Sequence, residues 1–462
     1  MKQLLINIFL WYLRTAAKIQ LIKIKPEIIA LTGSVGKTSL RNAIYAVLKD
    51  NFKCKKSAKA NSETGIPLDL LGLHPKDYSL IDWLKLSLLV PWKLLTNWQK
   101  YAYYIVELGV DDPYPPKNME YLLRFIHPDI AIFLNVALVH SLQFGKLTTK
   151  EVDFKTEKEK QEFLLKAIAK EKGRIITSLS EDKTAIVNSD DPLVMEQAEK
   201  SKAKKFYFGK KLRDQQEDAP GIDKFLKIGD YEVNLDGCKF EFEYLKNNYI
   251  LKLPYLLPEY YGYTFAAAIL TAISLKIPID LATNNLATNF KSPPSRMSVF
   301  KGIKDTIIID SSYNASKTAT LGALDLLKKI NISSNNKKRS KVFVFGDMRE
   351  LGEEAKVEHI EVAGKISEVC NRVVLIGPLT KEYVLPVVSG KIKYKWFTNS
   401  WEASSWLKEN LYSGELILIK GSQNTIFTEI VVEALLADKK DIKKLCRRGK
   451  FWDRQRLAIK NL

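Results

Sequence analysis

Apolar runs and helical patterns alternate along the chain from about residue 26 onward. Short runs rich in Val, Ile and Leu predict buried parallel strands, and they are Tyr104–Val106, Ile130–Leu134, Ala185–Val187, Thr306–Ile309, Val342–Phe345, Val373–Ile376 and Leu416–Ile419. Polar or Gly-containing turns follow each run, often with a helical pattern after them. This alternation predicts an α/β fold with mostly parallel sheets.

The pattern changes in the middle of the chain. Between Lys205 and Leu256 apolar and polar positions alternate, as in residues 239–244, which predicts an antiparallel insertion or an edge sheet. An Ala-rich helical pattern follows at Tyr263–Leu275. Residues 292–295, Ser-Pro-Pro-Ser, then indicate a linker to a second α/β unit. We therefore expect four parts, at residues 1–25, 26–291, 296–437 and 438–462.

The two ends of the chain are basic. Residues 1–25 contain five Lys and Arg and no acidic residue, around an apolar run at Leu4–Leu13 that is too short to span a bilayer. Residues 438–462 contain ten Lys and Arg against three Asp. A second apolar stretch, residues 83–98, contains Pro91, which we expect to interrupt its helix.

These segments allow two interpretations. Each apolar stretch can lie on a membrane surface as an interfacial helix, or it can pack against the protein's own core. Because basic residues accompany both, we expect peripheral membrane contact through residues 1–25, 83–98 and the tail at 438–462.

The composition limits the class of protein. An apolar content of 46% over 462 residues is that of a globular protein with two or three domains. The net charge of +19 indicates an anionic partner or surface, but no nucleic-acid recognition motif accompanies it. The four cysteines have neither metal-ligand spacing nor a disulfide framework, so we expect a cytoplasmic protein.

A Gly-rich loop between an apolar run and a helical pattern is the clearest chemical signal. Residues 32–39 read Thr-Gly-Ser-Val-Gly-Lys-Thr-Ser, a shorter form of the standard phosphate-binding loop. Its N–H groups and the Lys37 ammonium suit phosphate, and the Thr38 hydroxyl suits Mg²⁺. We expect this loop to bind ATP through Gly33, Ser34, Val35, Gly36, Lys37, Thr38 and Ser39.

Five further motifs follow in a fixed order. They are Val106-Glu107-Leu108-Gly109, Asn135 to Gly145, Asp310 to Ser316, Gly346 to Gly352 and Lys420-Gly421-Ser422. Together with the loop, this series resembles the Mur ligases of peptidoglycan synthesis, over about residues 27–436. The likeness is strongest to the members that add D-alanyl-D-alanine to a muramoyl tripeptide.

The resemblance implies a fold and an activity. The fold is a central ATPase domain with a mostly parallel sheet and an antiparallel insertion, followed by a Rossmann-like α/β domain. The activity is ATP-dependent amide-bond formation through an acyl phosphate, with ATP and Mg²⁺ as cofactors. The implied substrates are a small muropeptide and a D-amino-acid dipeptide.

The resemblance also assigns roles to residues of the central domain. Thr38 and Glu107 would hold one Mg²⁺, and His140 and Lys172 a second, with Lys37, His140 and Lys172 as the catalytic set. Lys172 matches a lysine that becomes carbamylated, although its neighbour Lys170 is an alternative. His74, His127 and His359 have no motif and are expected to be structural.

Residues near and beyond the linker receive roles in the same way. Arg296, Asp310 and Asn314 would contact the nucleotide, while Lys420 and Ser422 would hold the incoming substrate. Ser311 and Lys317 depart from the family's loop, and Gln423 stands where many relatives have Arg. The pair Asp190-Asp191 matches a family motif, but a turn stabilised by its own side chains is an equal alternative.

The beginning of the sequence also departs from the family. Mur ligases usually start with a domain that holds the UDP moiety, whereas here the phosphate loop begins at Gly33. Two other interpretations therefore stay open. The chain could be a Mur-type ligase that acts on a non-UDP or lipid-linked acceptor, or a non-catalytic, membrane-associated ATP-binding protein at the inner face of the plasma membrane.

Overall fold

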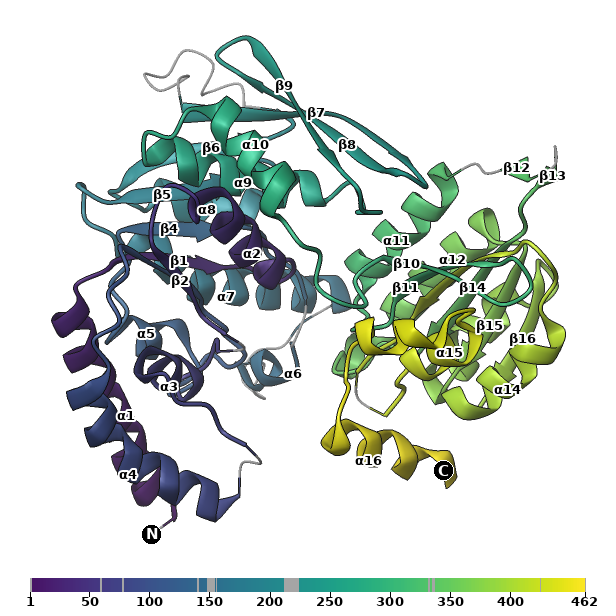
Figure 1. Ribbon diagram of the computed structural model, residues 1–462, viewed down its shortest axis with the longest axis horizontal. Helices are drawn as coiled ribbons and strands as arrows, with labels where there is room; N and C mark the ends of the chain where they lie inside the picture. The colour runs from purple at the N-terminus through teal and green to yellow at the C-terminus, as the bar shows by residue number, and fades with distance from the viewer. Residues whose placement is uncertain are drawn as a thin grey trace. The chain divides into compact units, whose positions relative to one another are not determined.

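The computed structural model describes residues 2–461 apart from residues 59, 77–78, 139–140, 148–153, 155, 212–223, 331–332, 335–336 and 424. The chain forms two compact α/β units (Figure 1). Unit 1 contains residues 1–230, 241–251 and 262–290. Unit 2 contains residues 231–240, 252–261 and 291–462. The segment 1–25 is thus part of unit 1, and the tail 438–462 is part of unit 2.

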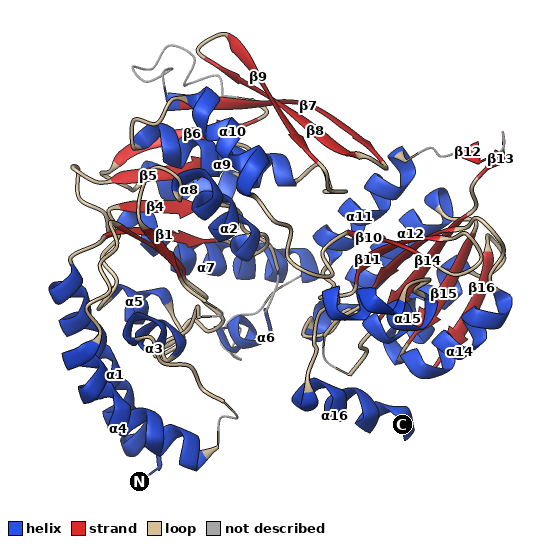
Figure 2. Cartoon of the chain, viewed as in Figure 1, coloured by secondary structure: helices blue, strands red, loops and turns tan. Residues whose placement is uncertain are grey.

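A nine-stranded sheet, in the order β2-β3-β1-β4-β5-β6-β7-β8-β9, organises the first part of the chain (Figure 2). Its first six strands in chain order are β1 (Glu27–Thr32), β2 (Cys54–Lys56), β3 (Tyr103–Glu107), β4 (Ile130–Phe133), β5 (Thr184–Asn188) and β6 (Lys204–Gly209). Neighbours from β2 to β7 pair in parallel. The strands predicted at 104–106, 130–134 and 185–187 are therefore confirmed.

The strands β7 (Phe225–Asn234), β8 (Gly237–Tyr244) and β9 (Asn247–Leu253) extend the sheet at one edge. Two-residue turns join them, so adjacent strands run in opposite directions, as the alternating pattern predicts. The start of the predicted range was wrong, however. Residues 204–209 form β6, which pairs in parallel with β5. Helix α8 (Pro192–Glu199) lies between the two strands in the chain and is the crossover that brings it back to the end of the sheet where β5 begins.

Helices cover the sheet of unit 1 on both faces. Helix α2 (Lys37–Leu48) contacts β3, while α7 (Glu157–Thr177) contacts β4 from the other face and shares a cluster with Ile28 and Ala30 of β1. The helices are α1 (Lys2–Ile24), α2 (Lys37–Leu48), α3 (Gly65–Leu71), α4 (Leu80–Thr96), α5 (Met119–Leu123), α6 (Ser141–Phe144), α7 (Glu157–Thr177), α8, α9 (Tyr261–Ser274) and α10 (Ile279–Asn289). Helix α9 confirms the Ala-rich helix predicted at 263–275.

Helix α4 continues through Pro91, so the predicted interruption was wrong. Proline lacks the N–H that would bond the carbonyl four residues earlier, which here belongs to Ser87. The Tyr12 hydroxyl of α1 donates to that Ser87 oxygen at 2.9 Å. A neighbouring helix therefore supplies the hydrogen bond that proline removes, and α4 remains a single helix.

Unit 2 contains a six-stranded sheet in the order β10-β11-β17-β14-β15-β16. Only the edge strand β10 is antiparallel to its neighbour; the other pairs are parallel. The strands are β10 (Ser298–Lys301), β11 (Ile307–Ser311), β14 (Lys341–Gly346), β15 (Arg372–Ile376), β16 (Lys393–Phe397) and β17 (Leu416–Lys420), with a separate hairpin β12 (Ser333–Ser334) and β13 (Lys337–Lys338). The four remaining predicted strands are confirmed.

Helices flank this sheet, namely α11 (Lys317–Lys329), α12 (Ala355–Val369), α13 (Leu385–Val388), α14 (Ser400–Asn410) and α15 (Glu429–Leu435). The last helix, α16 (Lys450–Ala458), packs through Trp452 against residues of α14 and α15. The tail is not a free chain, since several of its arginines pair with acidic residues of unit 2. Arg448 and Arg456 both contact Glu433, at 2.6 and 3.0 Å. Part of the tail's positive charge is thereby neutralised.

Within the described part of the chain, no helix combines the length and the apolar content that a membrane crossing requires.

Candidate active site

The predicted phosphate loop lies at the carboxyl end of β1 and leads into α2. Gly36 is the N-cap of α2 and has a φ of +89°, in the left-handed region that glycine adopts without strain. The N–H groups in the first turn of any helix have no partner within that helix. A loop that ends in such a turn suits an anionic phosphate.

Asn135, which follows β4, fixes the conformation of this loop. Its Oδ1 accepts hydrogen bonds from the backbone N–H of Ser34 and Val35, at 3.0 and 2.9 Å. Its Nδ2 donates to the Val35 carbonyl at 3.0 Å. The sequence motif contained Asn135, but only the structure shows that its amide group holds the phosphate loop.

The Lys37 ammonium lies over the loop itself. Its Nζ donates to the carbonyl oxygens of Gly33 and Ser34, at 2.8 and 3.2 Å. A positive charge is therefore already positioned at the loop where a phosphate would bind.

Thr38 and Glu107 lie in contact, as predicted for a shared metal site. The Thr38 hydroxyl donates to Glu107 Oε2 at 3.0 Å, and Glu107 is buried at the carboxyl end of β3. The guanidinium of Arg41 lies 3.7 Å from the same oxygen. Sequence reasoning missed Arg41, although a spacing of three residues puts it on the same face of α2 as Thr38.

Lys172 is buried on α7, and its Nζ donates to the Val110 carbonyl at 3.2 Å. Burial, together with the nearby Lys37 charge, lowers the Lys172 pKa to about 7, although Asp111 and Glu107 oppose this shift. Lys170 is exposed. Of the two alternatives, Lys172 is the one that lies beside the phosphate loop.

The neighbours of Lys172 explain its position. The Glu171 carboxylate accepts the Met119 N–H at 2.8 Å, which ties this turn of α7 to the start of α5. A Cβ on Gly173 would lie 2.5 Å from the Gln197 side chain, so α8 can pack this closely only against glycine. Lys172 thus lies at the site, while the next residue, Gly173, allows α8 to pack closely against α7.

Of the two residues predicted to hold a second Mg²⁺, the structure describes Lys172 alone. His140 lies outside the described residues, so its predicted role as a ligand is untested. Among the residues that the structure describes, no three His, Cys, Asp or Glu side chains lie together as a metal-binding group. A metal at this corner would depend on Thr38 and Glu107, whose hard oxygens suit Mg²⁺.

The Asp190-Asp191 pair has a structural function in the described chain. Asp191 caps α8, accepting the N–H groups of Leu193 and Val194, and its second oxygen accepts the Val136 N–H at 2.8 Å. Asp190 accepts the Tyr263 hydroxyl at 2.7 Å. These contacts are those that the turn interpretation predicts.

In unit 2, Asp310 is fully buried at the end of β11. Its oxygens accept the Ser295 hydroxyl at 2.7 Å and the Ser312 N–H at 3.0 Å, and burial raises its pKa. Arg296 follows Ser295, and its guanidinium lies 4.5 Å from the centre of the Tyr313 ring. Asn314 is half-buried, and its Oδ1 accepts the Ala315 N–H at 2.8 Å. Asp310 thus holds its own loop, and its predicted contact with nucleotide stays a prediction.

Lys420 and Ser422 join three motif loops of unit 2. The buried Lys420 ammonium donates to the Ser311 hydroxyl at 3.2 Å and the Asn314 carbonyl at 2.9 Å. The Ser422 hydroxyl accepts the Arg349 N–H at 2.8 Å. The predicted substrate contacts of both residues stay predictions, but their role in ordering the loops is visible.

Two family models match the chain, the Mur ligase middle domain at residues 164–272 and the "Mur ligase, glutamate ligase domain" at residues 295–423. The chain belongs to the Mur ligase family. Together the two models cover about half of the chain, and they include Lys172 of unit 1 and the Asp310 and Lys420 loops of unit 2.

Curated relatives of this Mur ligase are named UDP-N-acetylmuramoyl-tripeptide–D-alanyl-D-alanine ligase. One from Buchnera aphidicola (subspecies Baizongia pistaciae) is 27% identical over 417 residues, which is 89% of this chain and 75% of the relative. One from Bacillus subtilis is 23% identical over 94% of this chain and 81% of the relative.

Solved structures agree on the fold. The MurF ligase from Thermotoga maritima, crystallised with ADP, has a TM-score of 0.70 and 22% identity, covering 94% of this chain and 84% of that chain. A MurF from Acinetobacter baumannii has a TM-score of 0.67 and 20% identity, covering 91% of this chain and 79% of that one. The expected fold, a central domain with a mostly parallel sheet followed by a C-terminal α/β domain, is confirmed.

Arg447 in the tail of this Mur ligase is a residue that sequence reasoning missed. Its guanidinium pairs with the buried Glu429, with Nη2 and Oε2 2.6 Å apart. It also donates to the carbonyl oxygens of Ser312 and Tyr313. The tail therefore orders the Asp310 loop, which the excess of positive charge alone could not reveal.

His359 is structural, as expected for a histidine without a motif. Its Nε2 accepts the Met348 N–H at 3.0 Å within the loop at 346–352. Burial lowers the His359 pKa to about 4, so its ring is neutral at physiological pH. His74 and His127 are exposed.

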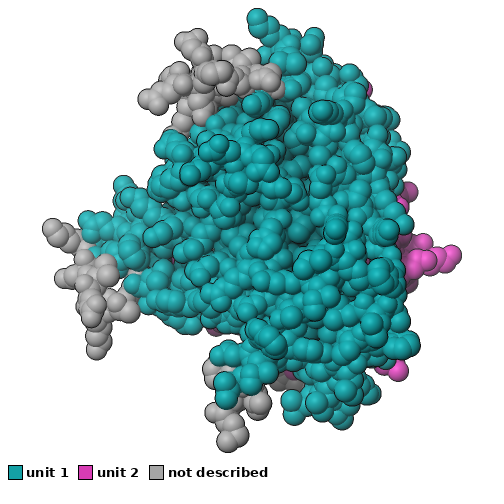
Figure 3. Space-filling view, turned by 90° about the vertical axis from the view of Figure 1, so that its left-hand side faces the viewer, with its two compact units in different colours: residues 1–230, 241–251, 262–290 teal, residues 231–240, 252–261, 291–462 magenta. Residues whose placement is uncertain are grey.

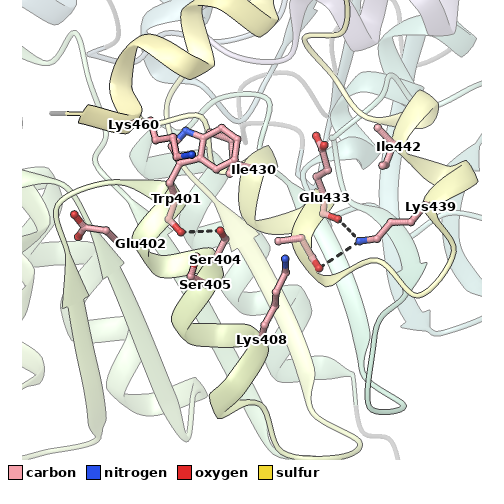
Figure 4. Close-up of a pocket in the computed structure, with 11 residues that line it drawn as sticks. Trp401, Glu402, Ser404, Ser405, Lys408, Ile430, Glu433, Lys439, Ile442 and Lys460 are labelled. Carbon is pink, nitrogen blue, oxygen red and sulfur yellow. Dashed lines mark hydrogen bonds between the residues drawn. The ribbon is translucent and has the colours of Figure 1, made fainter.

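A cavity of about 600 Å³ lies elsewhere in unit 2, between α14, α15 and the tail (Figure 4). Trp401, Lys408, Glu433, Lys439 and Lys460 are among its lining residues. The Lys439 ammonium donates to the carbonyls of Glu433 and Ala434 at the end of α15. None of the residues that line this cavity belongs to a Mur ligase motif.

Proposed function

We propose that this protein is an ATP-dependent, ADP-forming ligase of peptidoglycan precursor synthesis that adds D-alanyl-D-alanine to a muramoyl peptide. The observation that supports this most is the single corner of unit 1 where Lys37, Thr38, Glu107 and Lys172 meet. A phosphate loop, a hard-oxygen pair and a buried lysine are the parts that acyl-phosphate chemistry requires. The names of the relatives indicate the substrates.

The loop and Lys37 would bind the phosphates of ATP. Backbone N–H groups at the start of α2 and the Lys37 ammonium place positive charge at the transferred phosphoryl group. Asn135 keeps the loop in shape through its contacts with Ser34 and Val35. A Mg²⁺ ion held by Thr38 and Glu107 would neutralise phosphate charge at the same corner.

The reaction follows from these positions. An oxygen of the acceptor's carboxylate attacks the γ-phosphorus of ATP, and the bond to the β-phosphate oxygen breaks, which releases ADP and leaves an acyl phosphate. The amino group of the dipeptide then attacks the acyl carbon. The bond between the acyl carbon and the phosphate oxygen breaks, and phosphate leaves with the bonding electrons. The nitrogen loses a proton, and an amide remains.

We further propose that Lys172 is carbamylated. Only the neutral amine adds CO₂, and a pKa of about 7 leaves a large neutral fraction at physiological pH. Addition forms a nitrogen–carbon bond, releases one proton and converts a buried cation into an anion. That anion would relieve the repulsion from Lys37 and, with His140, would supply ligands for a second Mg²⁺.

We also propose that the enzyme works in the cytoplasm, in contact with the inner face of the plasma membrane. The support lies in the exposed apolar side chains and the lysines of α1 and α4. Residues 438–462 would contribute less to this membrane contact, because arginines of the tail are buried in ion pairs with acidic residues of unit 2.

The experiment that tests the function is a matrix of acceptors and amines with ADP release as the readout. We expect release only when D-alanyl-D-alanine and a muramoyl tripeptide are present together. A lipid-linked acceptor that works while the UDP-linked one fails would change the acceptor class. ATP binding without ADP release under any combination would indicate a non-catalytic protein.

A further inference from the structure

Helices α1 and α4 form a parallel pair on one side of unit 1, the side that Figure 3 turns toward the viewer. The Phe9 and Trp83 rings meet edge to face with their centroids 5.5 Å apart. Further along, the Lys23 ammonium lies 4.0 Å from the centre of the Trp98 ring and donates to the Leu94 carbonyl at 2.6 Å. The pair is therefore in contact along most of its length.

One face of this pair packs inward. Leu13 and Ala16 of α1 and Leu86 and Val90 of α4 share a buried cluster with Leu68 of α3. The two helices are thereby attached to the folded domain. Their outward faces do not need to be apolar for the unit to fold.

The outward faces are nevertheless apolar. More than half of the exposed large hydrophobic side chains in the described residues lie on α1, on α4 or at Trp98 just after it. Leu80, Leu88 and Leu95 are 83%, 80% and 71% exposed. We define the α1–α4 face as the exposed side chains of Leu4, Ile8, Trp11, Ile19, Ile22, Leu80, Ile81, Leu84, Leu88, Leu89, Trp92, Leu95 and Trp98. A soluble monomer rarely exposes so many apolar side chains together unless they bind something.

The exposed charged side chains on the described parts of α1 and α4 are all basic. Lys18, Lys25 and Lys85 are exposed, and α1 contains no acidic residue. The only acidic residue of α4, Asp82, is buried and accepts the Lys76 N–H at 2.7 Å. The α1–α4 face is thus apolar with a basic border, which complements anionic lipid headgroups over an acyl layer.

A second copy of the chain fits this face less well. In a two-fold dimer the same patch meets itself, so the lysines of one copy would lie near those of the other. Anionic lipids would neutralise these charges, and tryptophans such as Trp11, Trp92 and Trp98 prefer the boundary between headgroups and acyl chains.

The position of the pair is compatible with turnover at a membrane. Helix α1 leads into the amino end of β1, and the chain leaves α4 for the amino end of β3, whereas the phosphate loop lies at the carboxyl end of β1. Because a strand of six residues spans roughly 20 Å, the loop and the pair lie at opposite ends of the sheet. Binding through the α1–α4 face would leave the loop uncovered.

We propose that the α1–α4 face is a membrane-docking surface that inserts shallowly into anionic bilayers without crossing them. This inference rests on the membrane contact in the proposed function and names the surface that makes it. Lipid binding through the α1–α4 face does not depend on ligase activity. The phosphate loop of a docked molecule faces away from the bilayer.

Vesicle co-sedimentation of the full chain tests this proposal. We expect binding to phosphatidylcholine vesicles with 30% phosphatidylglycerol at least tenfold tighter than to phosphatidylcholine alone. The double variant Leu88→Gln/Leu95→Gln should lose at least tenfold in affinity for the anionic vesicles, and Lys18→Glu/Lys85→Glu should lose the preference for them. Leu245→Gln/Ile250→Gln, which changes two exposed apolar residues elsewhere in unit 1, is the matched control.

Two further readouts separate the outcomes. Turnover with soluble substrates should be equal in the wild type and Leu88→Gln/Leu95→Gln, which shows that the variant is folded and that docking is distinct from catalysis. Equal vesicle binding by the wild type and both α1–α4 variants would overturn the proposal. The proposal would also be overturned if the wild type binds no vesicles and is instead a dimer, and if the Leu88→Gln/Leu95→Gln variant is a monomer.

Discussion

The Thr38 hydroxyl donates a hydrogen bond to the Glu107 carboxylate at 3.0 Å, although 69 residues separate the two in the chain. This contact joins the first turn of α2 to the carboxyl end of β3. It brings together beside the phosphate loop two hard oxygen atoms of the kind that Mg²⁺ binds.

Glu107→Gln should lower kcat by about 100-fold or more, because the amide keeps the size of the side chain but removes the negative charge that would bind Mg²⁺. ATP binding without metal should change little. Titration of activity with Mg²⁺ and a nucleotide-binding measurement without Mg²⁺ check both statements. Thr38→Ser, which keeps the hydroxyl, should stay close to wild type, and equal Mg²⁺ dependence in Glu107→Gln would contradict the metal role.

Lys172→Ala should abolish ligation, whereas Lys170→Ala should leave it nearly unchanged. Lys172 is buried beside the loop and Lys170 is exposed on the same helix. Carbon-13 NMR in labelled bicarbonate should show a carbamate signal that disappears in Lys172→Ala and persists in Lys170→Ala. Amide formation by Lys172→Ala at the wild-type rate would remove this residue from the mechanism.

Asn135→Ala should weaken ATP binding by about tenfold, since the N–H groups of Ser34 and Val35 lose their shared acceptor. Calorimetric titration with ATP measures the change. Asn289→Ala, at a half-buried amide of α10 in the same unit, is a suitable control. If both variants bind ATP like the wild type, Asn135 does not maintain the loop.

Arg447→Met should reduce the free energy of unfolding by about 3–5 kcal/mol, because it leaves the fully buried Glu429 carboxylate without its ionic partner. Denaturant unfolding of the full chain gives the value. The variant Arg454→Met changes an exposed arginine of the same tail and should have a small effect. Adding Glu429→Leu to Arg447→Met should restore part of the loss; no recovery would contradict the ion-pair explanation.

The stability of the protein should rise with pH above about 7, partly because of Lys420. Burial, with the nearby Arg296 charge, lowers the Lys420 pKa to about 7 in the folded chain. An unfolded lysine has a pKa near 10.4, so between these values the unfolded chain binds more protons and higher pH favours folding. Lys420→Met should flatten this rise by up to about 1.4 kcal/mol per pH unit.

Urea midpoints from pH 6 to pH 9 measure the slope, and Lys408→Met, at an exposed lysine, is the control. Below pH 7 the wild type and Lys420→Met should have parallel curves. Equal slopes between pH 7 and pH 9 would show that Lys420 keeps an ordinary pKa.

The strands could be predicted because burial on both faces leaves a direct mark on the sequence, as in Val342–Phe345. The continuity of α4 could not, since it depends on Tyr12, which lies 75 residues from Ser87 and donates the compensating hydrogen bond. A local rule about proline contains no information about a neighbouring helix.

The candidate active site also contains some residues that could be placed from the sequence and others that could not. The phosphate loop and Glu107 could be placed from motifs, because strand ends gather at one edge of a parallel sheet. The choice between Lys170 and Lys172 required the orientation of α7. Arg447 lay in a basic segment from which we expected membrane contact, and only its burial against Glu429 and the Asp310 loop reveals its function.

Isotope transfer tests the central claim most directly. A muramoyl tripeptide labelled with ¹⁸O in its terminal carboxylate should give up one labelled oxygen to the released phosphate when D-alanyl-D-alanine and ATP are present. That result requires a covalent bond between the acceptor's oxygen and the transferred phosphorus. Amide product with unlabelled phosphate, or ADP release without amide, would contradict acyl-phosphate ligation by this protein.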